Sequence, residues 1–178
     1  MLRTIIIAIF ALICVISCKE KEKPDDIIVE KVVEKPQEGP ASMPEDKQTG
    51  SVSWISNSEY SYTITRKADT QLPIVTNHGT EYYDNSIDVT ITRADGSKFF
   101  EKKFSKTNFA PALPKEFKEN GVLLGINFEK AEGNYLMFIV SVGSPDETNE
   151  EFYYARLKIS NLAVTSAEKI TDMSGLAN

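Results

Sequence analysis

Apolar and polar side chains alternate with a period of two residues along the C-terminal two-thirds of the chain. Residues 60–65 alternate aromatic or aliphatic positions with serine and threonine, and residues 87–92 and 122–128 repeat the pattern. Such alternation is typical of β-strands that bury one face. Residues 135–142 are apolar on both faces, which predicts a central strand covered on each side. The pattern predicts an antiparallel all-β domain over residues 51–178.

Turn signals separate these runs, and helical signals are scarce. Residues 93–97 place Asp95-Gly96 between two strands, which is a strong hairpin signal because glycine accepts positive φ. One short helical turn is expected near residues 105–108. A second is expected at residues 114–121, where proline opens the segment and glycine follows it. We therefore expect an antiparallel β-sandwich or a flattened small barrel with one or two short helical turns, and the alternation does not choose between them.

Composition changes abruptly before this domain. Residues 18–50 begin with alternating lysine and glutamate, contain four prolines and have no aromatic side chain. Such a segment buries too little apolar surface to offset the entropy of ordering it, so we expect a disordered tether. The apolar residues at 27–29 and 32–33 leave a second interpretation open, in which a short helix or strand docks on a partner.

The first 17 residues read as an export signal. Arg3 precedes an apolar stretch over residues 5–16, and Ser17 leads directly into Cys18. The stretch is too short for a membrane-spanning helix, which needs about 20 residues. The order resembles a bacterial lipoprotein signal peptide, which implies cleavage before Cys18 and acylation of that cysteine as a membrane anchor. The alternative is an ordinary secretory signal or a short anchor helix in which Cys18 is incidental.

Cleavage would remove Cys14 and leave Cys18 as the only cysteine, so a disulfide framework is not expected. The formal net charge of −6 at pH 7 disfavours nucleic acid and anionic phospholipid as partners. The charges at residues 19–22 loosely resemble the signal that directs lipoproteins of gut-type Bacteroidetes to the cell exterior. We expect an outer membrane lipoprotein, on the cell surface or the periplasmic face.

Residues that usually carry catalysis are sparse. His78 is the only histidine, no Gly-x-Ser-x-Gly elbow occurs, and Ser144 stands in a turn context. A hydrolase triad or a zinc site therefore has too few components, and we expect no catalytic residue, metal or cofactor. Residues 83–88 and the acidic residues 146–151 remain weaker candidates for a calcium site, although neither has the pattern of an EF-hand loop.

Aromatic residues are the better candidates for binding. Two adjacent pairs, Tyr82-Tyr83 and Tyr153-Tyr154, must each direct one ring away from the core if they lie in strands. Exposed tyrosine and tryptophan rings suit sugar stacking or a protein contact. With Trp54 near the start of the domain, these four tyrosines are the expected binding residues. The alternative is that the outward rings only cover strand neighbours and that Trp54 anchors the fold.

Several segments resemble a known family. They are residues 62–73, 82–85, 99–104 and 120–133. Together they are similar to Bacteroidetes lipoproteins whose domain is known only as one of unknown function. The resemblance covers roughly residues 60–172 and supplies no active site.

We therefore expect a non-catalytic envelope lipoprotein that binds a protein partner or a glycan. The alternative is a small hydrolase acting on an envelope or dietary polymer. A pocket holding two carboxylates, or His78 beside a serine, would favour the hydrolase. A shallow aromatic patch without perturbed titratable groups would favour the binding protein.

Overall fold

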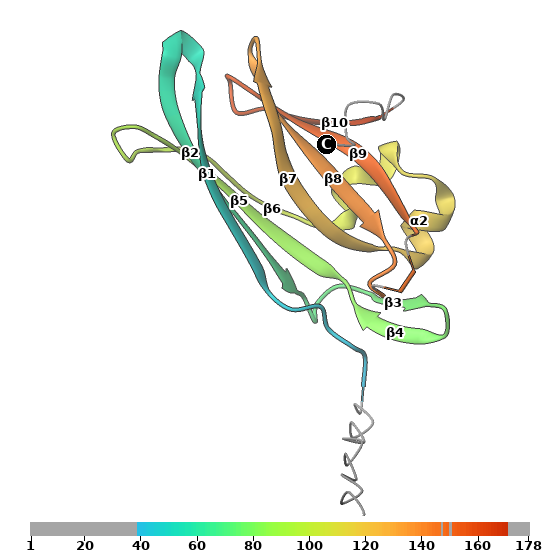
Figure 1. Ribbon diagram of the computed structural model, residues 1–178. Coiled ribbons are helices and arrows are strands. Elements are labelled where there is room, and N and C mark those ends of the chain that lie inside the picture. Colours follow the sequence, from blue (N-terminus) through green and yellow to red (C-terminus); the bar gives the residue numbers. More distant parts are fainter. Residues whose placement is uncertain (1–38, 147, 150, 171–178) are drawn as a thin grey trace, which may run out of the picture. The chain divides into compact units, whose positions relative to one another are not determined.

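The structure of the protein is a computed structural model that describes residues 39–146, 148–149 and 151–170 (Figure 1). The expected signal peptide, Cys18 and most of the expected tether lie outside the described residues. The described strands are β1 (Asp46–Trp54), β2 (Ser58–Ala68), β3 (Ile74–Asn77), β4 (Thr80–Tyr83), β5 (Asn85–Arg93), β6 (Lys98–Phe104), β7 (Val122–Glu132), β8 (Tyr135–Gly143), β9 (Phe152–Ser160) and β10 (Thr165–Lys169). The described helical segments are η2 (Ile55–Asn57), η3 (Lys106–Ala112) and α2 (Lys115–Asn120), and none of them is long and apolar enough to cross a membrane.

The strands form two antiparallel four-stranded sheets, ordered β1-β2-β5-β6 and β10-β9-β8-β7, and a separate two-stranded β3-β4 hairpin. Each four-stranded sheet is open, with two edge strands, so the sheets do not join into a barrel. The all-β expectation is confirmed, and the architecture is that of a sandwich. Most neighbours in a sheet are also neighbours in sequence, but β5 pairs with β2 because β3 and β4 leave the sheet.

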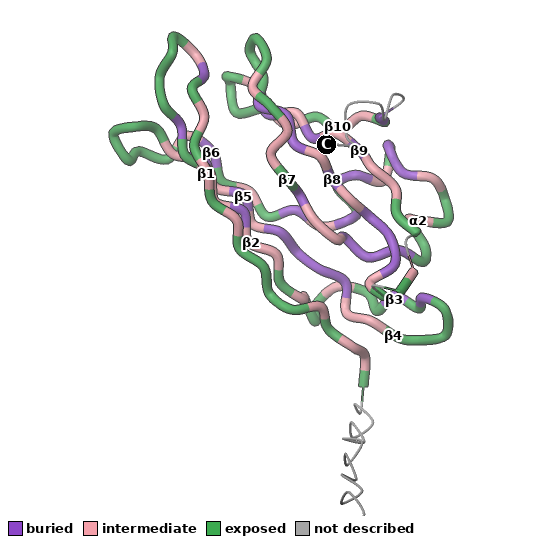
Figure 2. Tube along the Cα trace, viewed as in Figure 1, coloured by how far each residue is buried: buried purple, intermediate pink, exposed green. Residues whose placement is uncertain are grey.

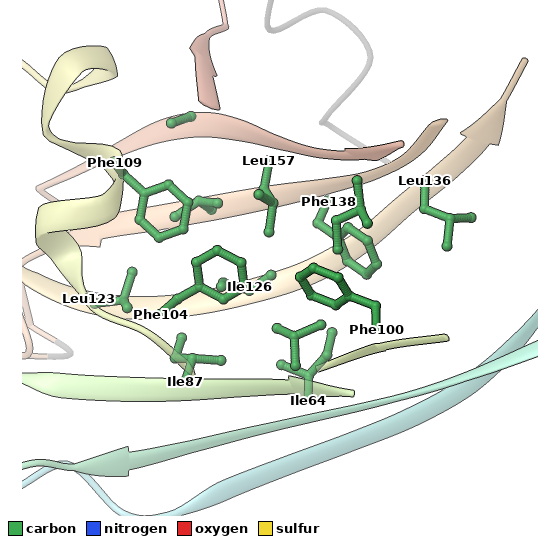
Figure 3. Close-up of a cluster of buried hydrophobic side chains, with 14 of the residues drawn as sticks. Ile64, Ile87, Phe100, Phe104, Phe109, Leu123, Ile126, Leu136, Phe138 and Leu157 are labelled. Carbon is green, nitrogen blue, oxygen red and sulfur yellow. The ribbon is translucent and has the colours of Figure 1, made fainter. Parts of the chain in front are cut away.

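The core lies between the inner faces of the two sheets. Buried and partly exposed residues alternate along β5 from Ile87 and along β8 from Phe138 (Figure 2). Ile87, Val89, Phe138 and Val140 are fully buried. One hydrophobic cluster joins residues from both sheets, with Phe109 of η3 closing over it (Figure 3). Each such aliphatic or aromatic side chain contributes about 1.5–3 kcal/mol by leaving water, so this cluster supplies the main stabilisation.

The expectation of a disordered segment up to residue 50 is wrong at its C-terminal end. Residues 46–50 belong to β1, which pairs with β2 in one continuous register from Asp46 to Trp54. Ala41 also forms a bridge with β4, accepting from the Tyr83 amide N–H at 2.9 Å. The sequence pattern did not predict this strand, because its side chains are mostly small and polar. The strand is ordered by backbone pairing with β2.

The turn expectations hold. The Asp95-Gly96 hairpin forms with Gly96 at φ 80°, and its amide N–H donates to the Arg93 carbonyl oxygen at 2.8 Å. The helical turn expected from residue 105 extends through η3, and Ser105 forms a capping box with Asn108. The second helix is α2, with Pro114 and Gly121 as its caps. Phe117 of α2 packs against the core cluster.

Gly143, the last residue of β8, leaves no room for a side chain. A Cβ there would lie 2.7 Å from the Cα of Phe152 and against the carbonyl oxygen of Glu151, so backbone would have to move. We expect Gly143→Ala to lower the free energy of unfolding by about 2 kcal/mol, measured by urea denaturation. The matched control is Gly125→Ala on β7, where the nearest atoms belong to side chains at 3.3 and 3.4 Å. Equal losses in both variants would contradict the backbone clash.

Candidate functional site

A pocket of about 410 Å³ opens where α2 meets the β3-β4 hairpin and the β8–β9 connection. In Figure 1, α2 and this hairpin lie at the same end of the sandwich. Three separate stretches of sequence supply its walls, and five of the seven lining residues are polar. The lining residues are Asn77, Glu116, Phe117, Asn120, Gly121, Ser144 and Glu151.

Two buried polar side chains form the inner wall of this pocket. Asn77 and Ser144 are 7% and 8% exposed, and the Ser144 hydroxyl donates to Asn77 Oδ1 at 2.8 Å. Asn77 Nδ2 donates in turn to the Asn120 carbonyl oxygen at 2.9 Å. Because buried polar groups are costly without partners, this network joins the ends of β3, α2 and β8 in one arrangement.

The β3-β4 turn positions Asn77. His78 and Gly79 form a two-residue loop with φ of 48° and 85°, as in the hairpin turns that require positive φ at both central positions. Asn77 therefore ends β3 with its side chain buried, while the His78 ring stays at the rim. There His78 Nε2 lies 3.4 Å from Glu151 Oε2 and 2.5 Å from Asn149 Nδ2.

Side-chain hydrogen bonds join the described residues of the connection between β8 and β9. The Thr148 hydroxyl and amide N–H donate to Asp146 Oδ1 at 2.7 and 2.9 Å, and the hydroxyl bond contributes most to lowering the pKa of Asp146. The Asp146 amide N–H donates to Ser144 Oγ at 3.2 Å. The loop beside the pocket is therefore arranged for an ionised Asp146.

The pocket does not assemble a serine hydrolase triad. Ser144 donates to Asn77, and the hydrogen-bond partners of His78 within the described residues are Glu151 and Asn149. Two carboxylates, Glu116 and Glu151, do line the same pocket, and both residues are exposed. The described part of the chain contains no cluster of three or more histidine, cysteine, aspartate or glutamate side chains that could hold a metal.

The residues considered for calcium have other partners. Asp84 is 4% exposed, and its Oδ1 accepts from the amide N–H groups of Asn85 and Leu123, each at 2.8 Å. Its Oδ2 lies 3.5 Å from Lys106 Nζ, within a buried ion pair. Asp88 instead pairs with Lys67 at 3.4 Å, where both side chains are substantially exposed. The two carboxylates serve separate interactions.

The expected aromatic binding residues do not gather at one place. Trp54 is buried, packs edge-on against Tyr60 and Phe99, and donates from Nε1 to the Gly133 carbonyl oxygen at 3.0 Å. Tyr82 and Tyr83 are half-buried in β4. In this position Trp54 anchors the fold.

The second tyrosine pair divides between the two faces of β9. The Tyr153 ring packs against Phe117 of the pocket wall, with ring centres 5.6 Å apart. Tyr154 packs against Phe152 on the opposite face, with ring centres 5.2 Å apart. Tyr153 therefore supports the pocket, and Tyr154 does not belong to it.

Sequence reasoning missed most of the pocket, because Asn77, Asn120 and Ser144 stand in unrelated segments. The one local signal was His78-Gly79, separated by two residues from the apolar positions 74–75, which marks a tight turn directly after Asn77.

The described residues define a protein built on an open antiparallel β-sandwich with a polar pocket at one end. The chain matches, over residues 26–166, the family described as "Domain of unknown function (DUF4738)", and it belongs to that family. No curated protein matches it. The family finding agrees with the resemblance to a domain of unknown function, and the match also takes in part of the segment before β1.

Proposed function

We propose that this protein is a non-catalytic envelope lipoprotein that binds a glycan in the Asn77–Ser144 pocket. The observation that carries the proposal is the lining of that pocket, where amide, hydroxyl and carboxylate residues occur together with one aromatic residue, Phe117. Sugars present hydroxyl groups for the polar atoms and apolar C–H faces for an aromatic ring. The volume of about 410 Å³ suits a small ligand such as the end of a glycan chain.

The proposed anchor is lipid on Cys18, which would hold the sandwich at the outer membrane, on the cell surface or the periplasmic face. Support comes from the order of Arg3, the apolar residues 5–16, Ser17 and Cys18. The acidic balance of the chain favours neutral ligands over nucleic acid, since a polyanion would meet a net charge of −6.

Glu116 gives the direct test of the pocket, since it lines the pocket from an exposed position of α2. The full-length protein is screened against arrayed bacterial, plant and animal glycans, and the strongest binder is titrated by calorimetry. We expect Glu116→Ala to raise the dissociation constant about tenfold, as for loss of a hydrogen bond to a charged group. Glu119→Ala, on the same short helix but outside this pocket, is the control. Retention of full affinity by Glu116→Ala would place the ligand elsewhere.

The pairing of Glu116 and Glu151 in one pocket favours a second candidate, a small glycoside hydrolase. Such enzymes use two carboxylates on opposite sides of the scissile bond, one as acid and one as base or nucleophile. The same glycans distinguish the candidates. If the protein is a hydrolase, new reducing ends appear in the glycan, and Glu116→Gln abolishes their release. If it is a binding protein, the glycan is recovered uncleaved.

A further inference from the structure

The two sheets of the sandwich expose four edge strands, and three of them carry features that discourage pairing with another chain. β6 contains Lys98, Glu101, Lys102 and Lys103, and its register with β5 shifts once. β7 has two register shifts against β8. β10 is five residues long and ends in charged residues. Charges, bulges and shortness are the usual protections of sheet edges.

The fourth edge, β1, lacks these protections over residues 48–53. It is nine residues long and pairs with β2 without a register shift. Its charged residues, Asp46 and Lys47, stand together at one end and cancel, and it contains no proline. Residues 48–53 carry only small or neutral side chains, and those facing outward are exposed. Within the described residues, no strand pairs with its outer edge.

We propose that β1 pairs antiparallel with β1 of a second copy, with the two Gly50 residues opposite each other at a twofold axis. The result is an eight-stranded sheet with the order β6-β5-β2-β1 followed by its symmetric counterpart. The inference is independent of the proposed glycan pocket. A closed twofold pairing uses the same edge on both copies, and it leaves no β1 edge open for further growth.

A register centred on Gly50 places no unfavourable pair between two copies. With Gly50 at the centre, Gln48 faces Val52 of the second copy on the inner side. On the outer side, Thr49 faces Ser51 and Lys47 faces Ser53. Facing residues share one side of a sheet, and hydroxyl pairs are favourable there. No like charges face each other across the contact. The charges of β1 itself, Asp46 and Lys47, cancel, so the net charge of −6 on each copy comes from residues outside β1.

Substitutions of Ser53 provide a test, because each is expected to change the affinity of the dimer and the stability of the monomer in opposite directions. Its side chain is exposed, and within the hairpin it pairs with Glu59. Ser53→Lys places like charges opposite Lys47 of the second copy at two symmetric positions and an opposite charge beside Glu59. We expect the dimer dissociation constant of the full chain in detergent to rise about tenfold. The Tm of the monomer, measured well below the dissociation constant because dimerisation itself raises Tm, should not fall. Ser53→Glu should tighten the dimer without raising the Tm of the monomer.

A cysteine pair tests the register itself. Facing positions lie within disulfide reach, whereas diagonal positions do not. A mixture of full-length Thr49→Cys and Ser51→Cys proteins should therefore form more disulfide dimer than either variant alone. Cys14 and Cys18 are present in all samples, so their contribution is the same throughout. Equal yields in the three samples, a dimer indifferent to the Ser53 variants, or a monomer at all concentrations would overturn the proposal.

Discussion

Replacing Cys18 with alanine is expected to abolish lipid attachment and release the protein from the membrane fraction. We propose that the Cys18 thiol accepts the first acyl group. Cys18 stands just after the apolar stretch, and a cysteine sulfur is a suitable nucleophile for that transfer. Each buried methylene contributes about 0.8 kcal/mol and a single chain anchors only weakly. Loss of all acyl chains should therefore move the protein from the membrane fraction to the soluble fraction. Incorporation of labelled palmitate in cells measures acylation, and phase separation in detergent measures membrane association.

Cys14→Ala is the matched control, since Cys14 lies four residues earlier within the segment expected to be removed. This variant should incorporate palmitate as the unchanged protein does. If Cys18→Ala still incorporated palmitate, Cys18 would not be the acylated residue. If Cys18→Ala lost the label but stayed in the membrane, Cys18 would still be the acylated residue, and the uncleaved apolar residues 5–16 would be what holds the variant there.

Asp84→Ala is expected to cause the largest loss of stability of any single substitution considered. Asp84 and Lys106 are nearly buried, with side chains 6% and 11% exposed. Removing the carboxylate leaves the Lys106 ammonium group without its counter-ion and the amide N–H groups of Asn85 and Leu123 without their acceptor. Breaking one side of a buried ion pair costs about 3–5 kcal/mol. Urea denaturation of the full chain measures the change.

Asp88→Ala provides the comparison, because Asp88 forms the exposed pair with Lys67 at 3.4 Å. Surface pairs contribute less than about 1 kcal/mol, so this variant should unfold close to the unchanged protein. Asp84→Asn retains an oxygen acceptor and should fall between the two. Equal losses of unfolding free energy in Asp84→Ala and Asp88→Ala would show that burial does not strengthen the Asp84–Lys106 pair.

The Asp84–Lys106 pair also bears on the pocket. Lys106 Nζ donates to the Gly121 carbonyl oxygen, and Asn77 Nδ2 donates to that of Asn120. Both bonds hold the C-terminal end of α2, which forms one wall of the pocket. The ion pair and the Asn77–Ser144 network therefore fix the same wall from two sides. Substitutions of Asp84 should be read for pocket binding only after folding has been checked.

The sequence by itself determined those strands in which apolar and polar residues alternate clearly, and which of their faces is buried. Ile87 and Val89 on β5 and Ile126 on β7 point inward as their alternation predicts. Local turn chemistry likewise set the hairpin at Gly96 and the helix between Pro114 and Gly121. These features depend on residues that are close in sequence, because a period of two and a positive φ are local properties of the backbone.

Only the tertiary structure decided how the strands are combined. Periodicity says that a face is buried but not what covers it, so it could not choose an open sandwich over a barrel or place β5 beside β2. Strand β1 escaped notice because its order depends on hydrogen bonds to β2 more than on its own side chains. The pocket joins Asn77, α2 and Ser144, which are far apart in sequence. Their proximity comes from long-range packing, which no single segment encodes.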